Sequence, residues 1–241
     1  MRVVISQPML FPWPGFLEQI RLADVFVRYD DVQFSKGSFT NRVQFKTAKG
    51  SQWLTVPLAG LSLGQRIDEV RVDRRSDWKG RHHMMLAQAY AEAPYCADML
   101  ALLDRVYAED CDTIADISWL SLRLLCEYFQ IGCNTRFVGI RELGIDGAGS
   151  QRVLDVVKAL GGSHYVTGLG ARNYLDHESF ERAGIQVDYM DYQKRPYPQL
   201  HGAFTPYVSG LDLAANLGAE GADLLQPNAI PWREFLKNER T

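Results

Sequence analysis

Two acidic side chains follow a run of strand-forming residues. Asp30 and Asp31 come directly after the run 25–29, and Gln33 stands two residues further on. Because side chains alternate between the two faces of a strand, only one of the two carboxylates can face a given pocket if the strand continues. A carboxylate at a strand end can act as a general base toward an amine or a hydroxyl, and we expect Asp31 to have that role. The alternative is a solvated acidic turn that is ion-paired to a nearby basic side chain.

His201 is the second candidate for proton transfer. It lies in an irregular stretch and is followed directly by Gly202. An imidazole in such a stretch can serve as a base near neutral pH. A Ser-His-Asp site that used Ser209 would need a nucleophile elbow, and the chain has no G-x-S-x-G motif. Ser209 is better explained as the N-cap of a helix with Asp212 at its third position.

Further polar residues near predicted strand ends and turns are candidates for substrate binding. They are Gln7, Asp30, Gln33, Asn41, Arg42, Gly168 and Arg172. Gly168 leaves backbone N–H groups accessible and Arg172 can hold a phosphate or carboxylate through two hydrogen bonds, although a tight strand-to-helix turn needs the same glycine. The phosphate-loop patterns G-x-G-x-x-G and G-x-x-x-x-G-K are absent near the first strand, which argues against a dinucleotide-dependent dehydrogenase or an ATPase.

The cysteines and histidines do not have the spacing of a metal site. The four cysteines form no C-x-x-C pair, and the neighbours His82 and His83 would point about 100° apart on a helix. We therefore expect no metal site and free thiols, and the sequence identifies no cofactor.

The elements that must position these residues alternate between strands and helices. Short β-branched runs predict strands at 2–6, 25–29, 136–140, 164–167 and 185–190. Helical spacing of apolar residues predicts helices at 15–23, 150–160 (capped by Ser150) and 176–183, and three more between 76 and 131. The runs 43–46 and 53–57 bracket a turn and predict a hairpin. The expected fold is α/β, a Rossmann-like sheet flanked by helices.

The expected domain organisation is a single α/β domain over residues 1–241. It has a helical insertion at about 76–131 and a C-terminal tail at about 219–241, in which 227–241 forms a short helix and a frayed end. The net charge is −3, from 26 basic and 29 acidic residues, so we expect no bulk nucleic-acid binding. The first residues contain neither a signal-peptide core nor a membrane span, which predicts a cytoplasmic protein without membrane insertion.

At these motifs the chain resembles the WbqC-like family of bacterial proteins. The matching segments cover about 1–218: the opening strand into Gln7 and Pro8, the segment Asp24–Phe34, Asn41 with Arg42, Trp53–Pro57, and Ser209–Leu213. The resemblance implies transfer of glycine or a related acyl group onto an amino sugar or similar amine, in the biosynthesis of surface polysaccharides such as O-antigen. The implied partner is a small-molecule substrate, with a nucleotide sugar as one possibility.

In the implied mechanism, Asp31 or His201 removes a proton from the acceptor amine, while Asn41, Arg42 and backbone N–H groups near Gly168 stabilise the oxyanion. Two alternatives stay open. One is a non-catalytic protein that binds a nucleotide sugar or a partner. The other is a nucleotidyl or adenylate-forming transferase, although the chain lacks the His-x-Gly-His signature of such enzymes at its first strand-to-helix turn.

Overall fold

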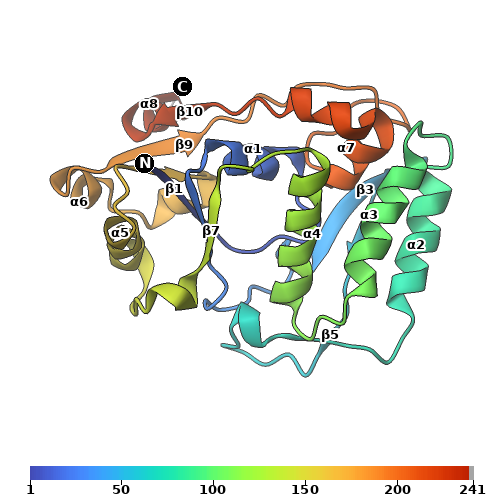
Figure 1. Cartoon of the computed structure of the whole chain (residues 1–241), viewed down its shortest axis with the longest axis horizontal. Coiled ribbons are helices and arrows are strands. Elements are labelled where there is room, and N and C mark those ends of the chain that lie inside the picture. Colours follow the sequence, from blue (N-terminus) through green and yellow to red (C-terminus); the bar gives the residue numbers. More distant parts are fainter. Residues whose placement is uncertain (239–241) are drawn as a thin grey trace.

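The computed structural model describes residues 1–238 and has a central sheet of six strands (Figure 1). The sheet order is β10-β9-β8-β1-β2-β7, and its strands are β1 (Arg2–Ser6), β2 (Val25–Arg28), β7 (Arg136–Gly139), β8 (His164–Thr167), β9 (Gln186–Met190) and β10 (Ala229–Pro231). The first five in chain order are parallel, and β10 pairs antiparallel with β9. Doubly wound dinucleotide-binding sheets have this strand order, in which the direction of winding reverses between β1 and β8. The expected α/β class is confirmed.

Side-chain alternation along the strands divides the core between the two faces of the sheet. Val4 and Phe26 pack with α1 (Pro14–Leu22) and α4 (Ile114–Tyr128) in one hydrophobic cluster. Val3 points to the opposite face of the sheet. It packs there in a second hydrophobic cluster with helices α5 (Gly149–Ala159), α6 (His177–Arg182) and α8 (Trp232–Asn238). Both faces are therefore covered by helices, as a buried parallel sheet requires.

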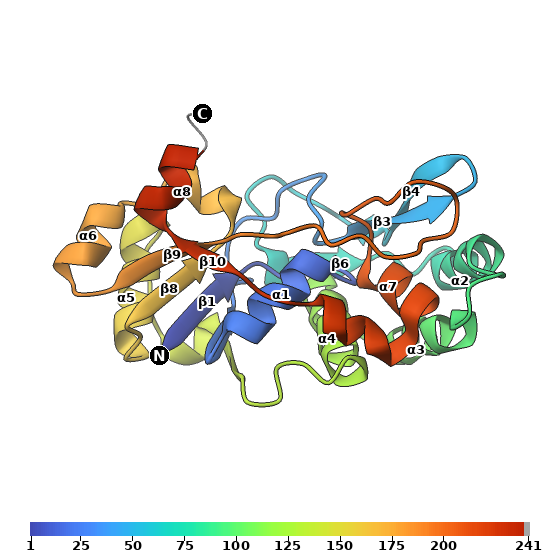
Figure 2. The ribbon, with the colours of Figure 1, turned by 90° about the horizontal axis from the view of Figure 1, so that it is seen from above.

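A long insertion between β2 and β7 forms the other half of the molecule. It contains the antiparallel hairpin β3 (Arg42–Thr47) and β4 (Gly50–Thr55), the short pair β5 (Leu58–Ala59) and β6 (Arg71–Val72), and the helices α2 (Trp78–Ala89), α3 (Cys96–Ala108) and α4. Figure 2 shows this half beside the sheet, together with α7 (Gly210–Leu217), which contacts α3. The 3-10 turns are η1 (Ile67–Glu69), η2 (Ile140–Leu143), η3 (Leu169–Asn173) and η4 (Gly218–Leu224).

The predicted strands, hairpin and helices are confirmed, but the short pair β5–β6 and the 3-10 turns were not predicted, and two further details differ. Ser150 does not cap α5: the helix begins at Gly149 after Ala148, and the Ser150 hydroxyl accepts a hydrogen bond from the Asp176 N–H instead. The chain end forms β10 before α8, whereas the sequence predicted only a helix. The frayed end predicted for the last residues lies outside the described residues at 239–241. The prediction of one domain stays a prediction.

A buried polar network joins α7 to the irregular segment before it and to the insertion. Asp212 is fully buried and accepts hydrogen bonds from the Tyr90 hydroxyl (2.7 Å), the Tyr197 hydroxyl (2.7 Å) and the Gln199 amide (2.9 Å). Lys46, on β3, donates from Nζ to the Gln199 side chain and to the backbone around it. Each member has a partner, which makes the burial of these polar groups tolerable.

A buried carboxyl group on α1 makes stability depend on pH. Burial raises the pKa of Glu18 to about 7, against the opposing charge of Arg195, and its Oε2 accepts no hydrogen bond. A folded-state pKa above that of the unfolded chain means that the folded state holds the proton longer. The stabilisation is therefore present below about pH 4.5 and is lost as the pH rises to about 7.

We expect the Glu18→Gln variant to lack this loss. Its unfolding free energy should exceed that of the natural chain at pH 8, on the order of 1–3 kcal/mol, and the difference should shrink toward pH 5. Urea denaturation of both proteins across this pH range measures the difference. Subtracting the two curves removes the opposite contribution of His82, whose pKa burial lowers to about 4. Parallel curves would show that Glu18 is ionised in the folded chain throughout.

Candidate functional site

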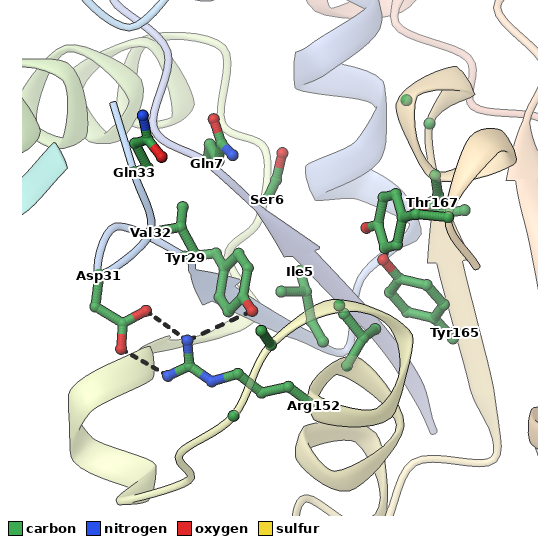
Figure 3. A pocket seen from close by; sticks show the side chains of 18 of the residues that line it. Ile5, Ser6, Gln7, Tyr29, Asp31, Val32, Gln33, Arg152, Tyr165 and Thr167 are labelled. Carbon is green, nitrogen blue, oxygen red and sulfur yellow. Dashed lines mark hydrogen bonds and ion pairs between the residues drawn. The ribbon is translucent and has the colours of Figure 1, made fainter. Parts of the chain in front are cut away.

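A cavity of about 740 Å³ opens at the carboxyl ends of the central strands (Figure 3). Ser6 ends β1, Tyr29 follows β2 and Thr167 ends β8, and all three line the cavity. It therefore lies where the direction of winding of the sheet reverses, which is the usual place for a ligand in an open α/β sheet. Its volume suits a ligand of nucleotide size.

One wall of the cavity carries an ion pair between Asp31 and Arg152. Arg152 Nη1 and Nη2 donate to the two Asp31 carboxylate oxygens at 2.9 and 2.6 Å, as Figure 3 shows. Arg152 Nε donates to the Ile145 carbonyl, and the guanidinium lies 5.1 Å from the centre of the Tyr29 ring. The hydrogen bonds that Arg152 donates to Asp31 raise the pKa of Arg152, so this side chain stays charged. A guanidinium has five N–H donors, so the Nη2 group keeps one for a ligand.

The start of α5 forms part of the same wall. Gly147, Ala148 and Gly149 line the cavity, and the N-cap residue Ala148 has no side chain that could accept from the first N–H groups of the helix. Gly147 and Gly149 have φ of +114° and +60°, backbone conformations that favour glycine. No acidic residue lies in the first turn. An uncapped helix start beside an arginine attracts an anionic group such as a phosphate.

Tyrosine and threonine hydroxyls form the opposite side. Tyr165 donates to Thr167 Oγ1 at 3.2 Å, and both side chains are buried. Burial raises the pKa of Tyr165 and Tyr174 on this side, and also that of Tyr29, which lies beside Arg152. These hydroxyls are therefore neutral at physiological pH and are available for hydrogen bonding rather than for proton abstraction.

Four of the residues predicted from the sequence meet at this cavity. Asp31, Gln7, Gln33 and Gly168 all line it, although they come from three different strand ends. Asp31 faces the cavity, whereas Asp30 does not line it, is buried elsewhere and pairs with Arg28 Nε at 2.7 Å. Because β2 ends at Arg28, both residues lie beyond the strand, and the alternation argument does not apply to them.

Three other predicted binding residues do not line the cavity. Asn41 is buried and donates from Nδ2 to the Val56 carbonyl, which fixes the hairpin. The Arg42 guanidinium lies over the Trp53 ring at 4.1 Å from its centre. Arg172 is exposed on η3, next to the cavity-lining residues Gly170 and Ala171 but not among them.

His201 lies at a different hollow from Asp31. This hollow has a volume of about 290 Å³ between the β3–β4 hairpin and α2. His201 has φ of +64°, and its Nε2 lies 2.7 Å from the Ala89 carbonyl, so the ring nitrogen is already used in a backbone contact. The two residues predicted as alternative bases for proton transfer thus lie at different sites.

The sequence reasoning missed Arg152 and Gln19. Arg152 is on the first turn of α5 and Gln19 is on α1, and both line the cavity. The Gly-Ala-Gly run at 147–149 before a predicted helix, with an arginine three residues later, is a signal that could have indicated the first of them.

Metal binding and membrane insertion find no support in the geometry of residues 1–238. No three His, Cys, Asp or Glu side chains of this part come together in a way that could hold a metal ion. Within the same residues, every helix is too short or too polar to span a bilayer.

Comparison with known proteins identifies the family. The model of the WbqC-like protein family matches residues 7–224, which include all the cavity-lining residues except Ile5 and Ser6. The "Uncharacterized protein Rv1507c" of Mycobacterium tuberculosis (strain ATCC 25618 / H37Rv) is 35% identical over 230 residues, which cover 93% of this chain and 97% of that protein. No solved structure gives a significant match. The chain belongs to the WbqC-like protein family.

Proposed function

We propose that this protein is a transferase that binds a nucleotide sugar in the cavity at β1, β2 and β8. The observation that carries the proposal is the position of the cavity at the winding reversal, with the uncapped start of α5 and Arg152 on one wall. Diphosphate oxygens suit that wall, because they can accept from helix N–H groups and from a guanidinium at once. The hydroxyl-rich opposite side suits a sugar.

The transferred group in this proposal is glycine or a related acyl group, which is the activity that the family resemblance implies. Among residues 1–238 the cavity lining contains no cysteine, histidine or lysine, so the hydroxyl groups of Ser6 and Thr167 have no imidazole or amine of the lining to activate them. This favours direct attack by the acceptor amine over an acyl-enzyme intermediate. In direct attack the amine nitrogen forms a bond to the carbonyl carbon, the bond to the leaving group breaks, and the nitrogen loses a proton. Asp31 is the acidic side chain that lines the cavity and could accept this proton.

A second candidate function is binding without catalysis. The observation that favours it is the engagement of Asp31, because both of its carboxylate oxygens already accept from Arg152. A base in that position must give up one of these bonds before it takes a proton. A protein that only holds a nucleotide sugar would need no such step.

A thermal-shift screen followed by mass spectrometry tests the proposal. The protein is screened against nucleotide sugars, including amino-sugar forms, and then incubated with each hit together with coenzyme A thioesters or with glycine and ATP. We expect a shift with an amino-sugar nucleotide and a mass increase equal to one acyl group. Binding with no mass change over hours would support the second candidate. Release of pyrophosphate from ATP without a sugar would contradict both and would indicate nucleotidyl transfer.

A further inference from the structure

The side chain of Gln19 is a buried amide without a partner. Gln19 is only 8% exposed, lines the cavity at β1, β2 and β8, and has no side-chain hydrogen bond to another of residues 1–238. Its amide atoms are not among the fully enclosed unpartnered atoms of these residues, so the small exposed part of the side chain is open to the cavity. Polar groups in such a position usually bond to water or to a ligand. Its position on the cavity wall means that a bound molecule can supply the missing bonds.

The surroundings of Gln19 indicate which end of a ligand it meets. Its Nε2 lies against Gly168, 3.3 Å from the place where a Cβ would stand on that glycine, so the amide is held at the end of β8. Thr167 precedes Gly168 in the chain, and its Oγ1 accepts a hydrogen bond from the Tyr165 hydroxyl. The Thr167 hydroxyl proton can therefore be donated to another acceptor. Gln19 and Thr167 thus offer an amide donor, an amide acceptor and a hydroxyl donor near one strand end.

The donors and acceptors of Gln19 and Thr167 differ in charge from the cavity wall at α5. The α5 wall is cationic through Arg152 and the helix start, whereas Gln19 and Thr167 are uncharged. An uncharged amide that can donate and accept matches sugar hydroxyl or acetamido groups, which also donate and accept. A phosphate accepts only, so it would leave the Gln19 carbonyl oxygen unpaired.

We propose that Gln19 is a specificity residue that binds the sugar of a nucleotide sugar, with Thr167 beside it and the diphosphate at the start of α5. This assignment rests on the proposed function, since it names the part of the proposed ligand that Gln19 binds. The assignment also explains why a polar side chain occupies this mostly buried position on α1, although it forms no hydrogen bond within residues 1–238.

The Gln19→Met variant tests this assignment, with Gln186→Met as its matched control. Gln186 is an exposed residue of β9 outside the cavity. Titration calorimetry measures binding of UDP-glucose, UDP-N-acetylglucosamine, dTDP-glucose and GDP-mannose to the natural chain and both variants, and then binding of the corresponding nucleoside diphosphate without sugar. We expect Gln19→Met to bind the nucleotide sugar about tenfold more weakly, with unchanged affinity for the nucleoside diphosphate, and Gln186→Met to match the natural chain.

The melting temperature without ligand separates a recognition role from a structural one. An amide that bonds to nothing in the fold can be replaced by a similar-sized apolar side chain without loss, so Gln19→Met should melt at the same or a higher temperature than the natural chain. A lower melting temperature would overturn the assignment, because it would show that Gln19 stabilises the fold.

The binding results distinguish failure of this inference from failure of the proposed function. Equal affinity of Gln19→Met and the natural chain for a nucleotide sugar would overturn the role of Gln19 alone. Equal weakening for the nucleotide sugar and the nucleoside diphosphate would overturn the assignment of Gln19 to the sugar. No binding of any of the four nucleotide sugars to the natural chain would overturn the proposed ligand class and the inference with it.

Discussion

The Asp212→Ala variant is expected to lose about 3–5 kcal/mol of unfolding free energy. Asp212 is fully buried, and its removal leaves the hydroxyls of Tyr90 and Tyr197 without an acceptor and Lys46 without its nearby negative charge. These groups cannot reach water without opening the contact between α7 and the segment before it. The loss therefore includes the cost of several unpaired buried groups, and not only of one hydrogen bond.

Urea denaturation measures this loss, with Asp98→Ala as a matched control. Asp98 accepts a hydrogen bond from the Tyr128 hydroxyl at 2.9 Å, but on the surface, where water replaces the lost bond. We expect the control to lose about 1 kcal/mol or less. The double variant Asp212→Ala with Tyr90→Phe should lose less than the sum of the single losses, because the second change removes a hydroxyl that the first left unpaired. Equal losses for the two alanine variants would contradict the prediction.

The Arg152→Met variant is expected to weaken binding of the nucleotide sugar found by the thermal-shift screen about 10- to 100-fold. A guanidinium donates charge-assisted hydrogen bonds, each of which contributes about 1.5–3 kcal/mol. The same change leaves Asp31 unpaired in a position where its side chain is only 15% exposed, so the fold should also lose on the order of 1–3 kcal/mol. Titration calorimetry and urea denaturation measure the two effects.

The double variant Asp31→Asn with Arg152→Met separates binding from stability. It removes both charges of the pair, so the stability should return toward that of the natural chain, while binding stays weak because the guanidinium is still missing. If the double variant regained affinity as well as stability, the guanidinium would have no direct contact with the ligand. The effect of Arg152→Met on binding would then come from a displacement of the cavity wall at α5.

The sequence was sufficient for the sheet because the strands are buried on both faces. A parallel strand between two layers of helices is rich in β-branched and apolar residues, and the run 25–29 was predicted as a strand from its β-branched residues. The different orientations of Asp31 and Asp30 do not follow from strand alternation, because β2 ends at Arg28. The short strand β10 was missed because its pairing with β9 depends on a contact between distant segments, and three residues carry little periodicity.

Site residues could be predicted from the sequence only where a residue closely follows a strand, because the end of the strand then fixes its position. Gln7 and Gly168 directly follow strands and Asp31 comes three residues after β2, so the parallel sheet brings them to one edge. Asn41 and Arg42 also stand near predicted strands, but local contacts with the hairpin hold them elsewhere. Arg152 and Gln19 approach the cavity from helices, and their direction depends on how those helices pack, which periodicity alone does not show.

The long insertion between β2 and β7 has a consequence for the kinetics of folding. The two strands are direct neighbours, with Val25 opposite Arg136, yet residues 29–135 separate them along the chain. Closing a loop of this length loses conformational entropy before the pairing of β2 with β7 contributes any stabilisation. Contacts between such distant residues slow folding. The helices α2, α3 and α4 contain mostly local contacts and form without that cost. We therefore expect the edge of the sheet that carries β7 to be completed only after the helical half has become compact enough to shorten the loop.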